Sequence, residues 1–340
     1  MYNIFMKKSI IFVNTQGYGD ILHSRQGVRW VVEQLGDKFN YYYIHNLNPD
    51  CCYIHYNVQV VSLEGRYMAQ SMEFVKKSLY STSTEDVRDA LFHNALCIDT
   101  WAASFEKMSR MPGIGFKLPD ENGNYHAGCE EIQDTTKSQA RLYVEKINQI
   151  NDFLLACLSS KKLTPPDHTA FVCQWNFNPR YKFFADGFLK RTSKFDLRIM
   201  ICNGNTTSTQ RRNFIYEEIL AEYIKANQNV CFILTSKLKE IDSPNVFYID
   251  DNFPIPNLDQ IEYLMKFCDI IVTSQSGPGC LAFTDAIVFD QTKTLIIFCI
   301  DSIQTYFEDG VCEYIRSSDF EDSNVLKVIS ETIEKKLTNK

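Results

Sequence analysis

Residues 9–30 read SIIFVNTQGYGDILHSRQGVRW, and this stretch decides the fold class. Its apolar run from Ile10 to Val13 predicts a short buried strand. A polar, glycine-bearing turn follows, and apolar residues then recur at near-helical spacing from Ile21 to Leu35. Strand, glycine turn and helix form the opening unit of a doubly wound α/β domain. Such domains bind ligands beyond the carboxyl ends of their strands, so the turn marks a first candidate site.

Short apolar runs and amphipathic segments alternate along the rest of the chain. The predicted strands cover residues 40–46, 56–63, 95–99, 170–174, 197–202, 229–235, 246–249, 269–273 and 294–299. The predicted helices cover residues 65–78, 84–92, 136–158, 214–227, 257–267 and 322–338, with a further helix after residue 279 and irregular chain at 111–135. This alternation in both halves predicts an α/β protein with two Rossmann-like, doubly wound domains that face a cleft.

The segment 159–168 carries adjacent prolines between polar flanks, which is typical of a linker. We therefore predict an N-terminal domain over residues 1–160 and a C-terminal domain over residues 169–320. The last residues, 321–340, are predicted to form a helix that packs on the body of the protein.

The net charge, the cysteines and the apolar runs of the sequence indicate the cellular compartment and the kinds of binding partner to expect. The net charge of −7 gives no sign of a general affinity for nucleic acid. The 12 cysteines are scattered without zinc spacing, which favours the reduced thiols of a cytoplasmic protein over a disulfide framework. No apolar run reaches membrane-spanning length, so only a peripheral membrane contact stays open.

Asp20 stands where the first glycine turn becomes the helix. An aspartate there can cap the helix, because its carboxylate accepts a backbone N–H and suits the positive end of the helix dipole. The same position can hold a catalytic carboxylate at the mouth of a ligand site, and the residues alone leave both roles open. Gly17 and Gly19 form a Gly-x-Gly pair, but no third glycine completes a dinucleotide-binding motif.

Two polar loops of the C-terminal half suit a phosphate. Residues 203–213 follow a predicted strand and combine hydroxyl groups with two guanidinium groups, the candidates being Thr206, Thr207, Arg211 and Arg212. Residues 274–279 open a predicted helix with small residues, which leaves backbone N–H groups for an anion. Each loop alone could be an ordinary solvated loop or tight turn, but two in one half favour a diphosphate site.

The sequence contains no Asp-x-Asp motif, which disfavours a nucleotide-sugar site built around a divalent metal. Arginines and helix N-termini would have to neutralise a leaving diphosphate instead. We therefore expect no metal and no cofactor.

The ordered motifs resemble those of glycosyltransferase family nine, the heptosyltransferases, which have the GT-B fold. Members of that family begin with a strand, a turn ending in Gly-Asp and a helix, as in Gly19-Asp20-Ile21-Leu22. A later strand ends in Asp, matched by Cys97-Ile98-Asp99. A Thr/Ser-rich loop with a basic residue is matched by residues 206–212, and a last loop by Gln275-Ser276-Gly277-Pro278.

Two positions depart from the family pattern. Gln275 stands where the family usually has Asp, and Cys280 stands near its usual His. Both family residues lie by the donor, so the identity of the donor stays open and the chain resembles a distant member.

The resemblance implies roles for the matched residues. Asp20 would be the general base that deprotonates the acceptor hydroxyl, and Arg211 or Arg212 would bind the diphosphate of the donor. The other implied donor contacts are Thr206, Thr207, Gln275, Ser276, Gly277 and Gly279. The candidates on the acceptor side are Gly19, His23, Asp99 and Trp101, each of which also has an ordinary structural interpretation.

The resulting hypothesis is a cytoplasmic, metal-independent, inverting glycosyltransferase. It would move a sugar from a nucleotide-sugar donor to a glycan or lipid-linked acceptor, with no nucleic acid as partner. Three alternatives stay open: a nucleotide-sugar epimerase, a DNA-modifying glycosyltransferase on the same fold, and a non-catalytic nucleotide-binding subunit. An epimerase would convert a nucleotide sugar without an acceptor, whereas a non-catalytic subunit would bind nucleotide without turnover.

Overall fold

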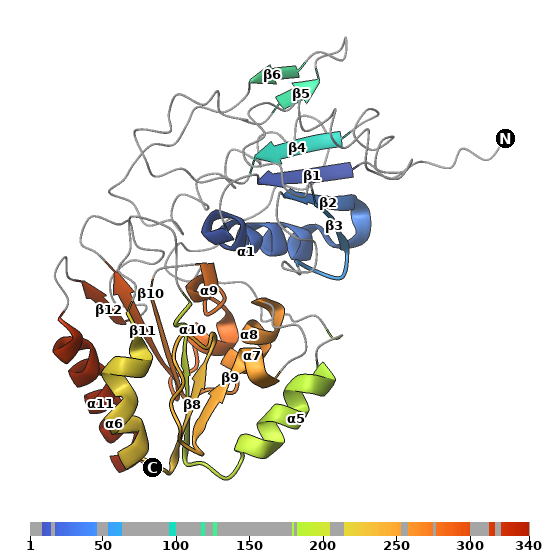
Figure 1. Cartoon of the computed structure of the whole chain (residues 1–340). Helices are drawn as coiled ribbons and strands as arrows, with labels where there is room; N and C mark the ends of the chain where they lie inside the picture. Colours follow the sequence, from blue (N-terminus) through green and yellow to red (C-terminus); the bar gives the residue numbers. More distant parts are fainter. Residues whose placement is uncertain are drawn as a thin grey trace. The chain divides into compact units, whose positions relative to one another are not determined.

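The structure is a computed structural model of the chain (Figure 1). The chain divides into two compact units, Met1–Cys173 and Gln174–Lys340. It describes residues 9–14, 18–45, 54–62, 95–99, 117–119, 125–127, 179, 182–204, 214–252, 258–274, 277–299, 313–316 and 321–339. The predicted helices 65–78, 84–92 and 136–158, the predicted strand 170–174 and the predicted linker 159–168 lie outside these residues.

The described part of the first unit is built on a sheet with strand order β3-β2-β1-β4-β5-β6. Its strands are β1 (Ser9–Asn14), β2 (Asn40–His45), β3 (Val58–Ser62), β4 (Ala95–Asp99), β5 (Lys117–Pro119) and β6 (Tyr125–Ala127). The pairs β1–β2, β2–β3 and β1–β4 are parallel, and β5 and β6 add an antiparallel edge. The stretch 111–135 was predicted as irregular, so β5 and β6 correct that prediction.

Helix α1 (Tyr18–Leu35) follows β1 as the opening stretch predicted. Its apolar stripe is buried, including Ile21, Val28 and Val32. Leu35 ends the helix because the next residue, Gly36, has φ +60°, a left-handed conformation that glycine adopts without strain and that stops helices. A short 3₁₀ turn, η1 (Gly36–Lys38), then leads into β2.

The described part of the second unit contains a parallel sheet with strand order β12-β11-β10-β7-β8-β9. Its strands are β7 (Leu197–Ile201), β8 (Val230–Leu234), β9 (Val246–Tyr248), β10 (Ile270–Ser274), β11 (Thr294–Cys299) and β12 (Glu313–Arg316). Its helices are α5 (Lys182–Thr192), α6 (Tyr216–Ala226), α7 (Ile249–Asn252), α8 (Leu258–Met265), α9 (Gly277–Cys280), α10 (Asp285–Val288) and α11 (Asp322–Thr338).

Helices cover both faces of this sheet (Figure 1). On one face α6 and α11 lie side by side, and α11 buries Val325, Ile329 and Ile333 in the same core cluster as the strands. On the other face, α5 and α8 are joined by a 2.9 Å hydrogen bond from the Tyr263 hydroxyl to Asp186. The unit therefore has the layers of a doubly wound domain.

Several features of the second unit differ from the sequence prediction. Helices α5 and α7 and strand β12 were not predicted. The helix expected after residue 279 is only the single turn α10, and a further single turn, α9, begins at Gly277 within the predicted loop. The described cysteines of this unit are free and buried, as expected for core thiols; they are Cys202, Cys231, Cys268, Cys280 and Cys299.

None of the helices in the described ranges combines the length and hydropathy needed to cross a bilayer.

Candidate functional site

The candidate donor site lies at the topological switch of the second sheet. Strand β7 has β10 on one side and β8 on the other, with Val272 of β10 paired with Ile201 of β7. Because the connections from β7 and from β10 leave the sheet side by side at its carboxyl edge, they border the crevice where such sheets bind ligands. These two connections are the polar loops that the sequence singled out.

Most of the predicted donor residues lie in the centre of those connections. Six of these predicted residues lie outside the described residues: Thr206, Thr207, Arg211, Arg212, Gln275 and Ser276. The structure describes the residues that border each connection: Gly204 and Phe214 for the first, and Ser274 and Gly277 for the second.

Gly279 makes a close approach to the end of β10. A Cβ at this position would stand 2.6 Å from the carbonyl oxygen of Ser274 and 2.6 Å from Thr273 Oγ1, too close for any side chain. The glycine therefore lets α9 fold back against the strand. Since α9 is only one turn long, its dipole is small, and the predicted anion site depends on the backbone N–H groups of the turn rather than on a long helix.

Cys280, which stands near the family's usual histidine, is 1% exposed. In the same unit, burial raises the pKa of Cys202, which follows β7 directly, to about 12. Both side chains therefore belong to the interior, and the Cys202 thiol stays protonated at neutral pH.

The first unit has its own switch point. Strand β1 lies between β2 and β4, and Val13 of β1 pairs with Asp99, the last residue of β4. Helix α1 begins at Tyr18, so Gly19, Asp20 and His23 belong to its first two turns. The structure thus brings Asp20 and Asp99 to the carboxyl edge of one sheet, whereas Trp101 lies outside the described residues.

The helix start bears on the two roles considered for Asp20. With α1 beginning at Tyr18, Asp20 is the third helical residue and not the N-cap. An acidic residue in the first turn still interacts favourably with the helix dipole. The position of Asp20 within the helix therefore does not match an N-cap, and the catalytic role stays a prediction.

Hydrogen bonds fix the start of α1 against β2. The hydroxyl groups of Ser24 and Tyr43 are 2.5 Å apart, and the Tyr43 hydroxyl also donates to the Ile21 carbonyl at 3.2 Å. Arg25 and Arg29, both fully buried, lie on the same helix, and Arg29 Nε donates to the Ile54 carbonyl. The sequence analysis missed these arginines, although Ile21, Arg25 and Val28 follow the spacing of the buried stripe.

A buried polar network joins the connections after β7 and β8. Asn203, 3% exposed, donates from Nδ2 to Glu217 Oε1 at 2.8 Å and to the Ser236 carbonyl at 2.7 Å. Its Oδ1 accepts from the Ser236 N–H at 2.9 Å and from Thr235 Oγ1 at 3.2 Å. Glu217 of α6 is 1% exposed and was also missed from the sequence.

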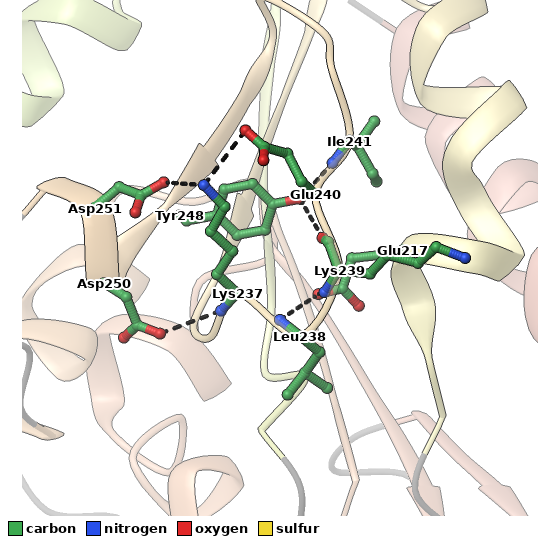
Figure 2. A network of polar contacts seen from close by, with 9 residues as sticks. All are labelled: Glu217, Lys237, Leu238, Lys239, Glu240, Ile241, Tyr248, Asp250 and Asp251. Carbon is green, nitrogen blue, oxygen red and sulfur yellow. Dashed lines mark hydrogen bonds and ion pairs between the residues drawn. The ribbon is translucent and has the colours of Figure 1, made fainter.

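Side chains also shape the rest of the β8–β9 loop, residues 235–245 (Figure 2). The backbone N–H groups of Leu238 and Lys239 donate to Glu217 Oε1 at 3.1 and 3.3 Å. The Tyr248 hydroxyl accepts from the Ile241 N–H at 2.9 Å and donates to the Lys239 carbonyl at 2.8 Å. The loop is therefore held by polar side chains from α6 and β9.

Lys237 belongs to the same loop. Its ammonium lies 3.0 Å from Asp251 and 3.4 Å from Glu240, and 5.4 Å from the centre of the Tyr248 ring. The hydrogen bond to Asp251 raises the pKa of Lys237, with Glu240 acting in the same direction. Because two carboxylates already offset its charge, Lys237 is a weaker candidate for a phosphate contact than the arginines of residues 205–213.

Comparisons with known proteins identify the fold. No protein-family model and no curated protein matches the chain. Solved structures do, at low sequence identity. A family 9 glycosyl transferase from Veillonella parvula DSM 2008 has a TM-score of 0.52 and 11% identity, over 96% of this chain and 90% of that one.

Two structures from E. coli are similar to the same degree. Heptosyltransferase WaaC with ADP has a TM-score of 0.51 and 14% identity, over 96% of this chain and 98% of its own. ADP-heptose LPS heptosyltransferase II has a TM-score of 0.50 and 13% identity, over 96% and 99%. The predicted fold class, GT-B with two Rossmann-like doubly wound units, is confirmed by these similarities.

Proposed function

We propose that the chain is an inverting, metal-independent glycosyltransferase that moves a sugar from a nucleotide-sugar donor to a glycan or glycolipid hydroxyl, in the manner of heptosyltransferases. One observation carries the proposal. The two segments with phosphate-binding composition leave β7 and β10, which are neighbours at the switch point of a parallel sheet, in a fold shared with glycosyltransferases.

The second unit would bind the donor. Arg211 or Arg212 would pair with the diphosphate, because a guanidinium group offers several N–H donors to phosphate oxygens. Thr206, Thr207, Gln275 and Ser276 would contribute further donors, and Gly277 and Gly279 backbone N–H groups. WaaC was solved with ADP, so adenine nucleotides are the first donors to test here.

The first unit would bind the acceptor, with Gly19, His23, Asp99 and Trp101 near the reacting hydroxyl. Asp20 would accept the proton of that hydroxyl, whose oxygen attacks the anomeric carbon of the donor sugar. The bond from the anomeric carbon to the diphosphate oxygen breaks, and the nucleoside diphosphate leaves with the electron pair. A single displacement of this kind inverts the anomeric centre.

The departing diphosphate carries the charge that has to be stabilised. Arginine and backbone N–H groups can do so without a metal, if they are fixed in place before the reaction. The proposed reaction should therefore continue in EDTA.

Isothermal titration with ADP, GDP, UDP and CDP in EDTA tests the donor side. We expect binding of one nucleotide class and at least about a tenfold rise in Kd for the Arg211→Ala/Arg212→Ala variant, the size expected for lost charged hydrogen bonds. The matched control is Lys190→Ala/Arg191→Ala, an exposed basic pair on α5 of the same unit, which should leave Kd unchanged. Failure of every nucleotide to bind the folded wild-type protein would refute the proposal.

A further inference from the structure

Helix α5 of the second unit exposes two large apolar side chains in its first turn. Phe183 is 83% accessible and Phe184 is 44% accessible, and their rings meet edge to face with centroids 5.9 Å apart. The other exposed large apolar residues in the described ranges stand singly on separate segments, which is ordinary for a protein surface. Two adjacent exposed phenylalanines on one helix therefore indicate an interaction surface.

The opposite face of α5 packs on the unit. Ala185, Phe188 and Thr192 are buried, and the Phe188 ring lies edge to face with Phe247 of β9, with ring centroids 5.6 Å apart. Figure 1 shows α5 at the rim of the second unit. The helix is thus held in place by its inner face, while its outer face is exposed.

Basic residues share this outer face with the phenylalanines. Phe183 and Lys190 lie two turns apart on one line of the helix, and Phe184 and Arg191 lie two turns apart on the next. Lys190 and Arg191 are exposed in the last turn, and Lys194, also exposed, follows the helix. We call these five side chains the α5 surface.

The α5 surface is positively charged, although the whole chain has a net charge of −7. The segment 182–198 contains five basic residues and two acidic ones. Both acidic side chains have partners within the unit, since Asp186 pairs with Lys182 and Asp196 accepts a hydrogen bond from Asn229 at 2.9 Å. The charge that this segment presents is therefore cationic, which suits an anionic partner.

The size of the α5 surface argues against a second protein as that partner. Helix α5 has 11 residues, whereas a stable protein interface takes about 20–30 residues from each side. A bilayer needs no matching shape, because aromatic rings enter the boundary between headgroups and acyl chains while Lys and Arg contact the lipid phosphates. Exposed aromatic rings and basic residues on one helix face fit such a boundary.

We propose that the α5 surface docks the second unit onto an anionic lipid bilayer. Phe183 and Phe184 enter the membrane interface, and Lys190, Arg191 and Lys194 contact the lipid phosphates. The contact is peripheral and reversible, because two rings and a few charges bind far more weakly than a spanning helix. The inference does not depend on the proposed sugar transfer, although a lipid-linked acceptor would lie on the same surface.

Co-sedimentation of the full chain with vesicles tests the docking. The probes are vesicles of phosphatidylcholine alone and vesicles of phosphatidylcholine and phosphatidylglycerol in equal amounts. We expect the wild type to bind the anionic vesicles at least about tenfold more tightly than the neutral ones, because each basic residue near an anionic surface adds affinity. Binding should weaken as the salt is raised from about 0.1 M to about 0.5 M, since salt screens these contacts.

Two variants separate the aromatic contribution from the basic one. Phe183→Ala/Phe184→Ala removes the rings, and Lys190→Ala/Arg191→Ala removes two charges. Each should weaken binding to the anionic vesicles at least about fivefold. Only the second should also reduce the salt dependence, because the rings bind without charge.

Matched controls come from the same unit. Phe289→Ala removes another exposed phenylalanine, 52% accessible, and Lys327→Ala/Lys335→Ala removes two exposed lysines of α11, which covers the other face of the sheet. Both controls should bind vesicles as the wild type does. Circular dichroism of every variant checks that it is folded.

The inference is overturned if the wild type does not bind the anionic vesicles, if it binds the neutral ones equally well, or if both folded α5 variants bind as tightly as the wild type. A wild-type dimer that Phe183→Ala/Phe184→Ala converts to a monomer in light scattering would also overturn it, because the surface would then join two copies of the chain. Nucleotide binding is a separate readout that Lys190→Ala/Arg191→Ala should leave unchanged, so a failure of the proposed function is distinguishable from a failure of docking.

Discussion

Gly279 of α9 packs so tightly on Ser274 at the end of β10 that a Cβ on the glycine would stand 2.6 Å from the serine carbonyl oxygen. The oxygen belongs to the backbone, so it cannot move aside without distorting the strand end. We expect Gly279→Ala to lower the free energy of unfolding by roughly 1–3 kcal/mol, the usual cost of overpacking. It should also weaken nucleotide binding, since the strand end borders the proposed site.

Gly187→Ala is the matched control for that variant. Gly187 lies inside α5, and a Cβ there would meet nothing within 4 Å. Alanine is the better helix former, so this change should stabilise the protein by about 0.5–1 kcal/mol. Urea unfolding of both variants measures the contrast, and equal effects of the same sign would contradict the packing described for Gly279.

Asn245 closes the turn between α6 and β8. Its side-chain Nδ2 donates to the carbonyl groups of Ile224, Asn227 and Val230 at 2.9–3.1 Å, and the residue is fully buried. Asn245→Ala leaves these acceptors short of a donor, which should cost roughly 2–3 kcal/mol in urea unfolding. Exposed Asn229, which pairs only with Asp196 among the contacts described here, should lose less than about 0.5 kcal/mol on change to alanine.

His45 makes the stability of the first unit depend on pH. Burial lowers its pKa from 6.5 to about 4. Between these values the unfolded chain binds a proton that the folded chain does not, so stability rises with pH from about 4 to 6.5 and falls on acidification. The shift is worth on the order of 3 kcal/mol over that window.

The measurement for His45 is the pH dependence of unfolding for the wild type and His45→Gln. Glutamine is polar but does not titrate, so the variant should show a smaller loss of stability between pH 6.5 and pH 4. Parallel curves over that window would show that His45 is not the group responsible.

Asp20→Asn tests the general base. The amide keeps the size of the side chain but cannot take up the acceptor proton, so kcat should fall at least about a hundredfold. The Kd for the nucleotide should not change, because the nucleotide would be bound by the second unit. Asp37→Asn, an exposed aspartate of η1, serves as the control and should keep wild-type kcat. A folded Asp20→Asn enzyme with full activity would rule out this role.

Much of the fold could be predicted from hydrophobic patterning. The strands at 95–99 and 294–299 and the helix 322–338 have the bounds that the sequence predicted. Buried parallel strands are continuous apolar runs, which are easy to find. Helix α5 was missed because exposed Phe183, 83% accessible, and Phe184 obscure the spacing of its buried residues, Ala185, Phe188 and Thr192.

The site was only partly predictable. Sequence reasoning found the two loops that follow β7 and β10, because strand ends with small, polar and basic residues suggest ligand binding. It missed Glu217, because a glutamate next to Glu218 at the start of an amphipathic helix suggests a solvated face. The available signal was spacing: Glu217, Leu220 and Ile224 share the buried face of α6. The partners of Glu217 could not be foreseen, since they come from distant segments.

Sugar transfer itself is the most direct test. The wild-type protein is incubated in EDTA with ADP-heptose and a panel of other nucleotide sugars, together with glycan and glycolipid acceptors, and the products are analysed by mass spectrometry. We predict that one donor adds a single glycosyl unit to an acceptor and releases an equal amount of nucleoside diphosphate. Conversion of a donor into another nucleotide sugar without an acceptor, or nucleotide binding with no turnover of any donor, would contradict the account.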